Sequence, residues 1–212
     1  MLATLEQLQV PLAVARQQLG ITGLSVAAAH NFRDKARMKT VLREAGVPCA
    51  RHALVAERSA AESFAGTVGF PLVVKPPAGA GGKGTFRLDD GAALSNYLQR
   101  YPLRADNPTL FEEFVRGTEY SFDSVMIDGK PVWHSISCYM PSPLEVLENA
   151  WIQWCVMLPR DITGVAFDPI REAAREFGHV RRITRRYDQY IHRVRITPQF
   201  AASDIPWLAG KN

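Results

Sequence analysis

A glycine-rich loop between two short strand-like runs constrains this sequence more than any other feature. Pro71–Lys75 before the loop has the pattern of a buried strand, and Thr85–Leu88 after it is also strand-like. Four glycines stand within six residues: Gly79, Gly81, Gly82 and Gly84, with Lys83 among them. Such glycines free backbone N–H groups to wrap around an anion. The segment predicts a strand–loop–strand flap over phosphate groups, with a flexible surface turn as the alternative.

The context of the loop excludes three better-known phosphate-binding motifs. Gly79, Gly81 and Gly84 fit the dinucleotide pattern G-x-G-x-x-G, but that loop must open directly into a helix. A P-loop requires Ser or Thr after its lysine, and here Gly84 follows Lys83. Protein kinases also close a glycine flap over a triphosphate, but no kinase catalytic-loop or metal-loop motif follows.

Two further lysines fit a nucleotide site. Lys75 ends an apolar strand, where a lysine is rarely found unless it is paired. Lys35 lies at the start of a predicted helix that Asn31 or Asp34 caps and that ends near Ala45. Lysines are usually solvated, so an exposed helix-face charge is the alternative for Lys35.

An acidic segment downstream reads as a hinge between two strands. Glu112 and Glu113 end the predicted strand Leu110–Val115, and Glu119 opens the strand Tyr120–Ile127. Backbone groups of such a hinge can read the edge of a base, and a carboxylate can accept both ribose hydroxyls. The alternative is that these acids form only the polar face of a strand.

Taken together, these segments resemble the ATP-grasp superfamily of carboxylate–amine and carboxylate–thiol ligases. The resemblance spans roughly residues 20–140, and its motifs are specific as a set. They are Phe32–Lys35, Ala45–Pro48, Gly69–Pro76, Gly79–Gly84, Glu112–Val115 and Glu119–Ser121. The resemblance implies an α+β, ATP-grasp-like fold with two small lobes, a glycine-rich flap and an incomplete C-terminal lobe.

The resemblance also implies a set of residue roles. Lys35 and Lys75 would contact ATP phosphates beneath the flap, which includes Lys83. Backbone groups near Glu112 and Val115 would hold adenine, with Glu113 between them, and Glu119 would bind the ribose. The family reaction uses ATP to activate a carboxylate as an acylphosphate, which an amine or another nucleophile then attacks. Mg²⁺ is expected for the family, but we find no motif for its protein ligands in the sequence.

The predicted organisation has four parts. Residues 1–30 would be a remnant of a preceding α/β domain, 31–107 the first lobe with the flap, 108–170 a partial second lobe, and 171–212 a basic atypical tail. Because the chain departs from the family at both ends, we expect the module to bind ATP without ligase turnover of its own. A small carboxylate is the expected substrate if the chain is active, and a separate chain that supplies the missing lobe is a further possibility.

The basic tail leaves several interpretations open. Residues 171–212 hold nine Lys and Arg against four Asp and Glu, whereas the rest of the chain is nearly neutral. Such a break predicts either a nucleic-acid-binding arm, which would make the chain a non-catalytic binding protein, or a segment of different origin from a frameshift or truncation. The tail has few aromatic residues and no recognised motif, which argues against nucleic acid. We expect it to be poorly ordered.

Composition indicates the oxidation state of the cysteines and the cellular location of the chain. Three cysteines without CxxC spacing favour reduced thiols rather than structural zinc or disulfides. No apolar run approaches the roughly 18 residues of a membrane span, and we read no signal peptide, so the expected location is the cytoplasm.

Local signals also predict a capping box of Ser59 and Glu62, a helix capped by Asp90, a hairpin turn at Asp128–Lys130, and a helix over Val165–Glu176.

Overall fold

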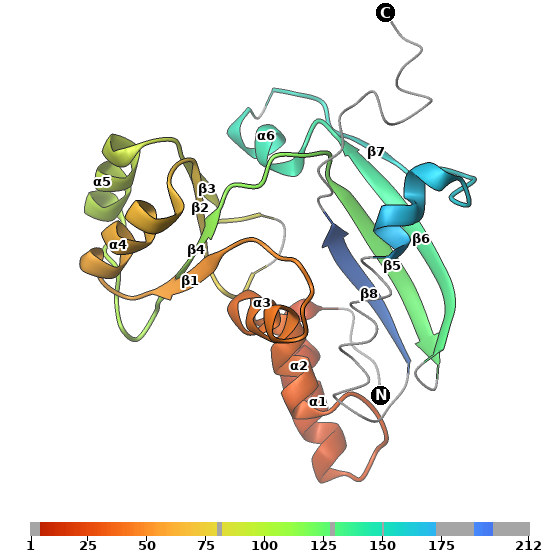
Figure 1. The fold of residues 1–212 in the computed structure, drawn as a ribbon. Coiled ribbons are helices and arrows are strands. Elements are labelled where there is room, and N and C mark those ends of the chain that lie inside the picture. The colour runs from red at the N-terminus through yellow and green to blue at the C-terminus, as the bar shows by residue number, and fades with distance from the viewer. Residues whose placement is uncertain (1–4, 80–81, 128–129, 150, 173–188, 197–212) are drawn as a thin grey trace, which may run out of the picture. The chain divides into compact units, whose positions relative to one another are not determined.

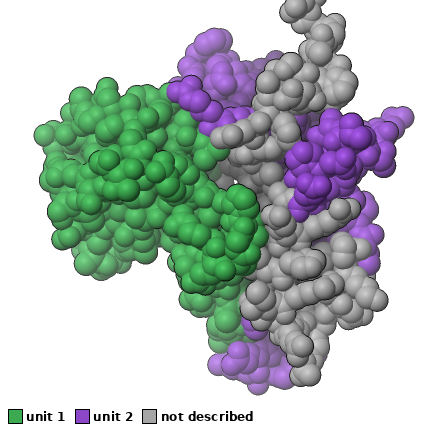
Figure 2. Space-filling model, in the orientation of Figure 1, with its two compact units in different colours: residues 1–14, 26–115 green, residues 15–25, 116–212 purple. Residues whose placement is uncertain are grey.

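The computed structural model describes residues 5–79, 82–127, 130–149, 151–172 and 189–196. The chain divides into two compact units, the first of residues 1–14 and 26–115 and the second of residues 15–25 and 116–212 (Figure 2). Figure 1 labels their helices and strands. Each unit contains an antiparallel four-stranded sheet together with helical segments, which confirms the predicted α+β class.

Helices lead into the first unit. The short 3₁₀ helix η1 (Glu6–Leu8) runs into α1 (Gln9–Gln18), and α2 (Val26–Arg33) is followed by α3 (Lys35–Glu44). Asp34 separates the last two and caps α3, because its side chain accepts hydrogen bonds from the amides of the second and third helical residues. Asp34 was one of the two caps predicted for this helix, the other being Asn31, whereas α2 was not predicted.

The first sheet has the strand order β1-β4-β2-β3. Its strands are β1 (His52–Val55), β2 (Leu72–Lys75), β3 (Phe86–Leu88) and β4 (Thr109–Glu113). β2 and β3 are antiparallel neighbours joined through the glycine loop, as the sequence predicted. β4 lies between β1 and β2, so its residues pair on both sides.

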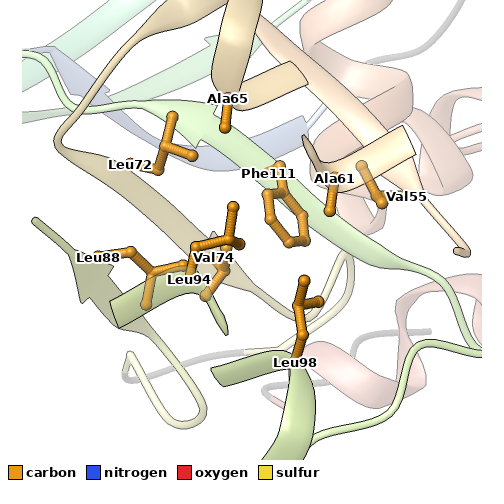
Figure 3. Close-up of a cluster of buried hydrophobic side chains, with 9 residues drawn as sticks. All are labelled: Val55, Ala61, Ala65, Leu72, Val74, Leu88, Leu94, Leu98 and Phe111. Carbon is orange, nitrogen blue, oxygen red and sulfur yellow. The ribbon is translucent and has the colours of Figure 1, made fainter. Parts of the chain in front are cut away.

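Two helices cover one face of this sheet. Residues of α4 (Arg58–Val68) and α5 (Gly91–Arg100) pack with strand residues in a single apolar cluster (Figure 3). Its buried members are Val55, Ala61, Ala65, Leu72, Val74, Leu88, Leu94, Leu98 and Phe111. Side chains alternate between the faces of a strand, so residues between these positions point to the opposite face.

Of the N-caps predicted for α5 and α4, the first is confirmed and the second is wrong. Asp90 caps α5 by accepting from the Ala93 amide, as predicted. The predicted capping box of Ser59 and Glu62 is wrong, because the N-cap of α4 is Glu57, two residues before Ser59, and it makes no side-chain cap bond. The Ser59 hydroxyl instead donates to the Glu57 carboxylate, and Glu62 forms an ion pair with Arg58.

The second sheet has the strand order β7-β6-β5-β8. It contains β5 (Tyr120–Ile127), β6 (Lys130–Met140), β7 (Cys155–Met157) and β8 (Gln189–Ile196). The β5–β6 pairing confirms the predicted hairpin, although residues 128–129 of its turn lie outside the described residues. The helix α6 (Pro143–Glu148) and strand β7 were not predicted.

The basic tail is only partly described. The 3₁₀ helix η2 (Val165–Phe167) leads into helical residues 168–172, and residues 173–188 and 197–212 lie outside the described part of the chain. Within the tail, β8 pairs with β5 along its whole length, and the expectation that the tail is poorly ordered stays a prediction. Four of its eight residues are aromatic or β-branched, which favours a strand. None of the described helices is long and apolar enough to cross a membrane.

Candidate functional site

Three charged side chains meet on the face of the first sheet that α4 and α5 leave uncovered. Val74 and Phe111 point into the apolar cluster, so the residues that follow them, Lys75 and Glu112, point to the other face. Lys39 reaches the same place from α3. Residues from a helix and two strands therefore converge on one point inside the first unit.

Glu112 is the centre of this group. Lys75 Nζ lies 2.7 Å from Glu112 Oε2, and Lys39 Nζ lies 3.4 Å from Oε1. The Glu112 side chain is only 7% exposed, and those of Lys39 and Lys75 are 13% and 22% exposed. Within the described residues, Oε1 accepts no hydrogen bond, so Lys39 contacts it as an ion pair of longer range. A buried carboxylate is stable here because two ammonium groups face it.

Lys35 is held against the start of the glycine loop. Its Nζ donates to the Gly79 carbonyl at 2.7 Å, and its backbone amide donates to the Pro77 carbonyl at 2.8 Å. Burial lowers the pKa of the Lys35 ammonium below its ordinary value of 10.5; the negative charge of Glu6 opposes this shift, and the positive charge of Lys75 adds to it. Lys35 and Lys75 are thus close enough for their charges to interact.

Within the described residues, the glycine loop requires glycine most clearly at Gly84. Its φ is +71°, and a Cβ there would lie 3.2 Å from Cγ of Pro76. Gly82 also has a positive φ, of +70°, and its carbonyl accepts from the Thr85 amide. Lys83 is exposed. Gly81 lies outside the described residues.

The predicted hinge, residues 112–115, is anchored by its own contacts. Glu113 binds Arg51 through two hydrogen bonds, from the backbone amide at 2.7 Å and from Nε at 2.6 Å. The Phe114 amide donates to the Pro71 carbonyl, and the Arg87 guanidinium lies 4.7 Å from the centre of the Phe114 ring. The Glu113 side chain therefore fastens β4 to the residue before β1, and Val115 follows at the end of the first unit.

Glu119 belongs to the second unit, where it directly precedes β5. It is partly buried, and its backbone carbonyl accepts from the Tyr139 amide at 3.3 Å. Next to it, the buried Tyr139 hydroxyl donates to Ser121 Oγ at 3.0 Å. These contacts fix the backbone around Glu119, and its proposed ribose contact stays a prediction.

Sequence reasoning overlooked Lys39. Its signal was its spacing of four residues from Lys35, which places both lysines on one face of α3. The spacing alone did not show that this face turns toward Glu112, because Glu112 lies more than seventy residues further along the chain.

The described residues hold no group of three or more His, Cys, Asp or Glu side chains that could bind a metal ion.

Curated relatives of the chain include ligases of two kinds. The carbamoyl phosphate synthase large chain of Mycobacterium sp. (strain JLS) is 27% identical over 180 residues, which is 81% of this chain and 16% of the relative. The D-alanine–D-alanine ligase of Ectopseudomonas mendocina (strain ymp) is 33% identical over 100 residues, 47% of this chain and 32% of the relative. The chain thus spans less than a third of the length of either protein.

Solved structures share the fold over most of the chain. L-amino acid ligase from Bacillus licheniformis matches with a TM-score of 0.71 and 18% identity, over 93% of this chain and 45% of its own. D-alanine–D-alanine ligase from Bacillus anthracis, solved as a complex with ATP, matches with a TM-score of 0.63 and 19% identity, over 89% of this chain and 58% of its own.

A family model described as "Phosphoribosylglycinamide synthetase, ATP-grasp (A) domain" matches residues 33–139, which are half of the chain. The matched range contains Lys35, Lys39 and Lys75, which form the lysine cluster, together with the glycine loop, the hinge and Glu119. The chain therefore belongs to the ATP-grasp family.

Proposed function

We propose that this chain is the ATP-binding module of a ligase that activates a carboxylate for attack by an amine or another nucleophile. The triphosphate would lie between the lysine cluster and the glycine loop. Adenine would contact backbone groups near Glu112 and Val115, and Glu119 would accept hydrogen bonds from the ribose hydroxyls. The family membership supports this assignment.

The observation that carries the proposal is the unbalanced charge of the cluster. Lys39 and Lys75 pair with a single carboxylate, that of Glu112, and the charge of Lys35 interacts with that of Lys75. Glu6, the other acid that acts on Lys35, is already paired with Arg33 at 3.0 Å. A partly buried site with an excess of positive charge is stabilised by an anion, and a polyphosphate provides several oxygens that accept from ammonium groups.

The same arrangement fits the chemistry of carboxylate activation. A carboxylate oxygen of the substrate attacks the γ-phosphorus, the bond to the β–γ bridging oxygen breaks, and ADP leaves. The nucleophile then attacks the acylphosphate carbon, and inorganic phosphate leaves. Fixed ammonium groups would stabilise the charge on the transferring phosphoryl group, and the closed loop would exclude water.

The test compares two lysines of the proposed site. Lys75 lies on a rigid strand inside the cluster, whereas Lys83 is exposed on the loop. We expect Lys75→Met to weaken the binding of a non-hydrolysable ATP analogue at least tenfold more than Lys83→Met, because a lost buried charge-assisted hydrogen bond is worth about 1.5–3 kcal/mol. Titration calorimetry measures both, with thermal melts as a check on folding. Equal affinities for wild type and Lys75→Met would show that Lys75 does not contact the nucleotide.

A further inference from the structure

We propose that Lys39 is a positioning residue, which acts on the nucleotide through Glu112 and Lys75 rather than by touching the phosphates. Its role is to keep Glu112 neutralised when the Lys75 ammonium leaves that carboxylate to bind a phosphate. This inference rests on the proposed ATP site and concerns how that site releases its own lysine.

The starting point is a competition for Lys75 that the site itself contains. Lys75 Nζ lies 2.7 Å from Glu112 Oε2, which is a short charge-assisted contact. A phosphate oxygen that recruits Lys75 must therefore compete with a buried carboxylate. If Glu112 had no second cation, its charge would be left uncompensated in a place that is only 7% exposed, which is strongly unfavourable.

Lys39 supplies that second cation at the other carboxylate oxygen. Its Nζ lies 3.4 Å from Glu112 Oε1, an atom that accepts no hydrogen bond from the described residues. The ion pair is thus longer than a charge-assisted hydrogen bond, and a small side-chain movement would shorten it. As Lys75 departs from Oε2, Lys39 can approach Oε1, and the carboxylate exchanges one close partner for another.

The position of Lys39 on α3 suits this role. Lys35, one helical turn earlier, donates to the Gly79 carbonyl at the start of the loop, whereas Lys39 is directed to Glu112 on β4. The two lysines on one face of α3 therefore bind different partners, a loop carbonyl and the Glu112 carboxylate. Of the two lysines that pair with Glu112, Lys39 has the less exposed side chain, at 13% against 22% for Lys75.

A double-mutant cycle on the full chain tests the proposal. The variants are Lys39→Met, Glu112→Gln and the two together, and the probe is β,γ-imido-ATP in titration calorimetry. We expect Lys39→Met to weaken binding about tenfold, a coupling typical of charged residues in contact. In the Glu112→Gln background the same change should have no effect, because there is no carboxylate to neutralise.

Three controls separate positioning from a structural role. Adenosine, which lacks phosphates, should bind Lys39→Met and wild type equally, whereas a distorted fold would weaken both ligands. Lys39→Arg should restore the affinity for β,γ-imido-ATP. Arg37→Met on the exposed side of the same helix should leave it unchanged, since Arg37 is bound to Asn31 and not to the cluster.

The outcomes distinguish this inference from the proposed function. If Lys39→Met weakens binding equally in both backgrounds, Lys39 contacts the phosphate itself and the positioning role is overturned. If Lys39→Met has no effect in the wild-type background, the role is likewise overturned while the ATP site stands. If wild type does not bind β,γ-imido-ATP at all, the proposed function fails and this inference fails with it.

Discussion

The two units use their sheets differently. In the first unit, one sheet face packs against α4 and α5 in a continuous apolar core, and the other face carries the charged cluster around Glu112. Among the described residues of the second unit, the core consists of Tyr120, Ile136, Cys138, Phe167 and Ile170, and many large apolar side chains are exposed. These are Leu19, Ile21, Val132, Trp133, Leu147, Trp151, Trp154, Val156, Leu158 and Val165.

This difference indicates that the packed core of the first unit holds the charged side chains of the site in place. Lys75 and Glu112 alternate with core residues along β2 and β4, so the packing of one sheet face fixes the charges on the other. In the second unit, Glu119 directly precedes β5, and its backbone carbonyl accepts from the Tyr139 amide. We therefore expect phosphate binding to depend on the first core, and the ribose contact to be the separable part of the site.

The largest effect should come from opening the first core. Phe111 is fully buried and makes edge contacts with the rings of Phe64 and Tyr97. Phe111→Ala should lower the free energy of unfolding by about 3–5 kcal/mol, since it removes a large side chain and leaves a cavity. Urea unfolding measures the change. Trp151→Ala in the second unit, where the side chain is 85% exposed, is the matched control and should change stability by no more than about 0.5 kcal/mol.

A smaller effect separates the contribution of the second unit. If Glu119 accepts the ribose hydroxyls, ATP should bind more tightly than 2′-deoxy-ATP by about 1.5–3 kcal/mol, the worth of a hydrogen bond to a charged group. Glu119→Ala should abolish this preference while Lys75→Met preserves it. If the preference for ATP persists in Glu119→Ala, Glu119 does not bind the ribose and is only a polar residue of the strand face.

The smallest effect concerns the anchor of the hinge. Burial alone would raise the pKa of Glu113, but hydrogen bonds from the Arg51 amide and guanidinium hold it below its ordinary 4.5. Because the folded state lowers this pKa, the carboxylate adds stability above about pH 4.5, and that stability is lost as the pH falls through the lowered pKa. Glu113→Gln should therefore be less stable than wild type at pH 7, with the gap closing in acid. Thermal melts across this range measure it, and a gap independent of pH would contradict the assigned ion pair.

Much of the first unit could be predicted because its signals are local. Asp34 and Asp90 cap the helices that directly follow them, and the strands around the glycine loop are adjacent in sequence. The capping box at Ser59 failed because two local signals competed, and the ion pair of Arg58 with Glu62 replaced the reciprocal cap.

The features that sequence reasoning missed depend on distant partners. Lys39 becomes part of the site only because β4 returns between β1 and β2 and brings Glu112 beneath α3. The strand β8 forms by pairing with β5, more than sixty residues earlier in the chain. Charge composition gave no sign of this pairing, since an arginine-rich stretch is compatible with a strand when its other residues are aromatic or β-branched.

The most direct test of the account is a comparison of affinities along one series of ligands. Adenosine, AMP, ADP and ATP are titrated into the full chain at fixed ionic strength. If the lysine cluster binds the phosphates, affinity should rise along the series and the rise should shrink in Lys75→Met and at high salt. Equal affinities for adenosine and ATP in the wild-type chain would contradict the account, because the cluster would then make no contact with phosphate.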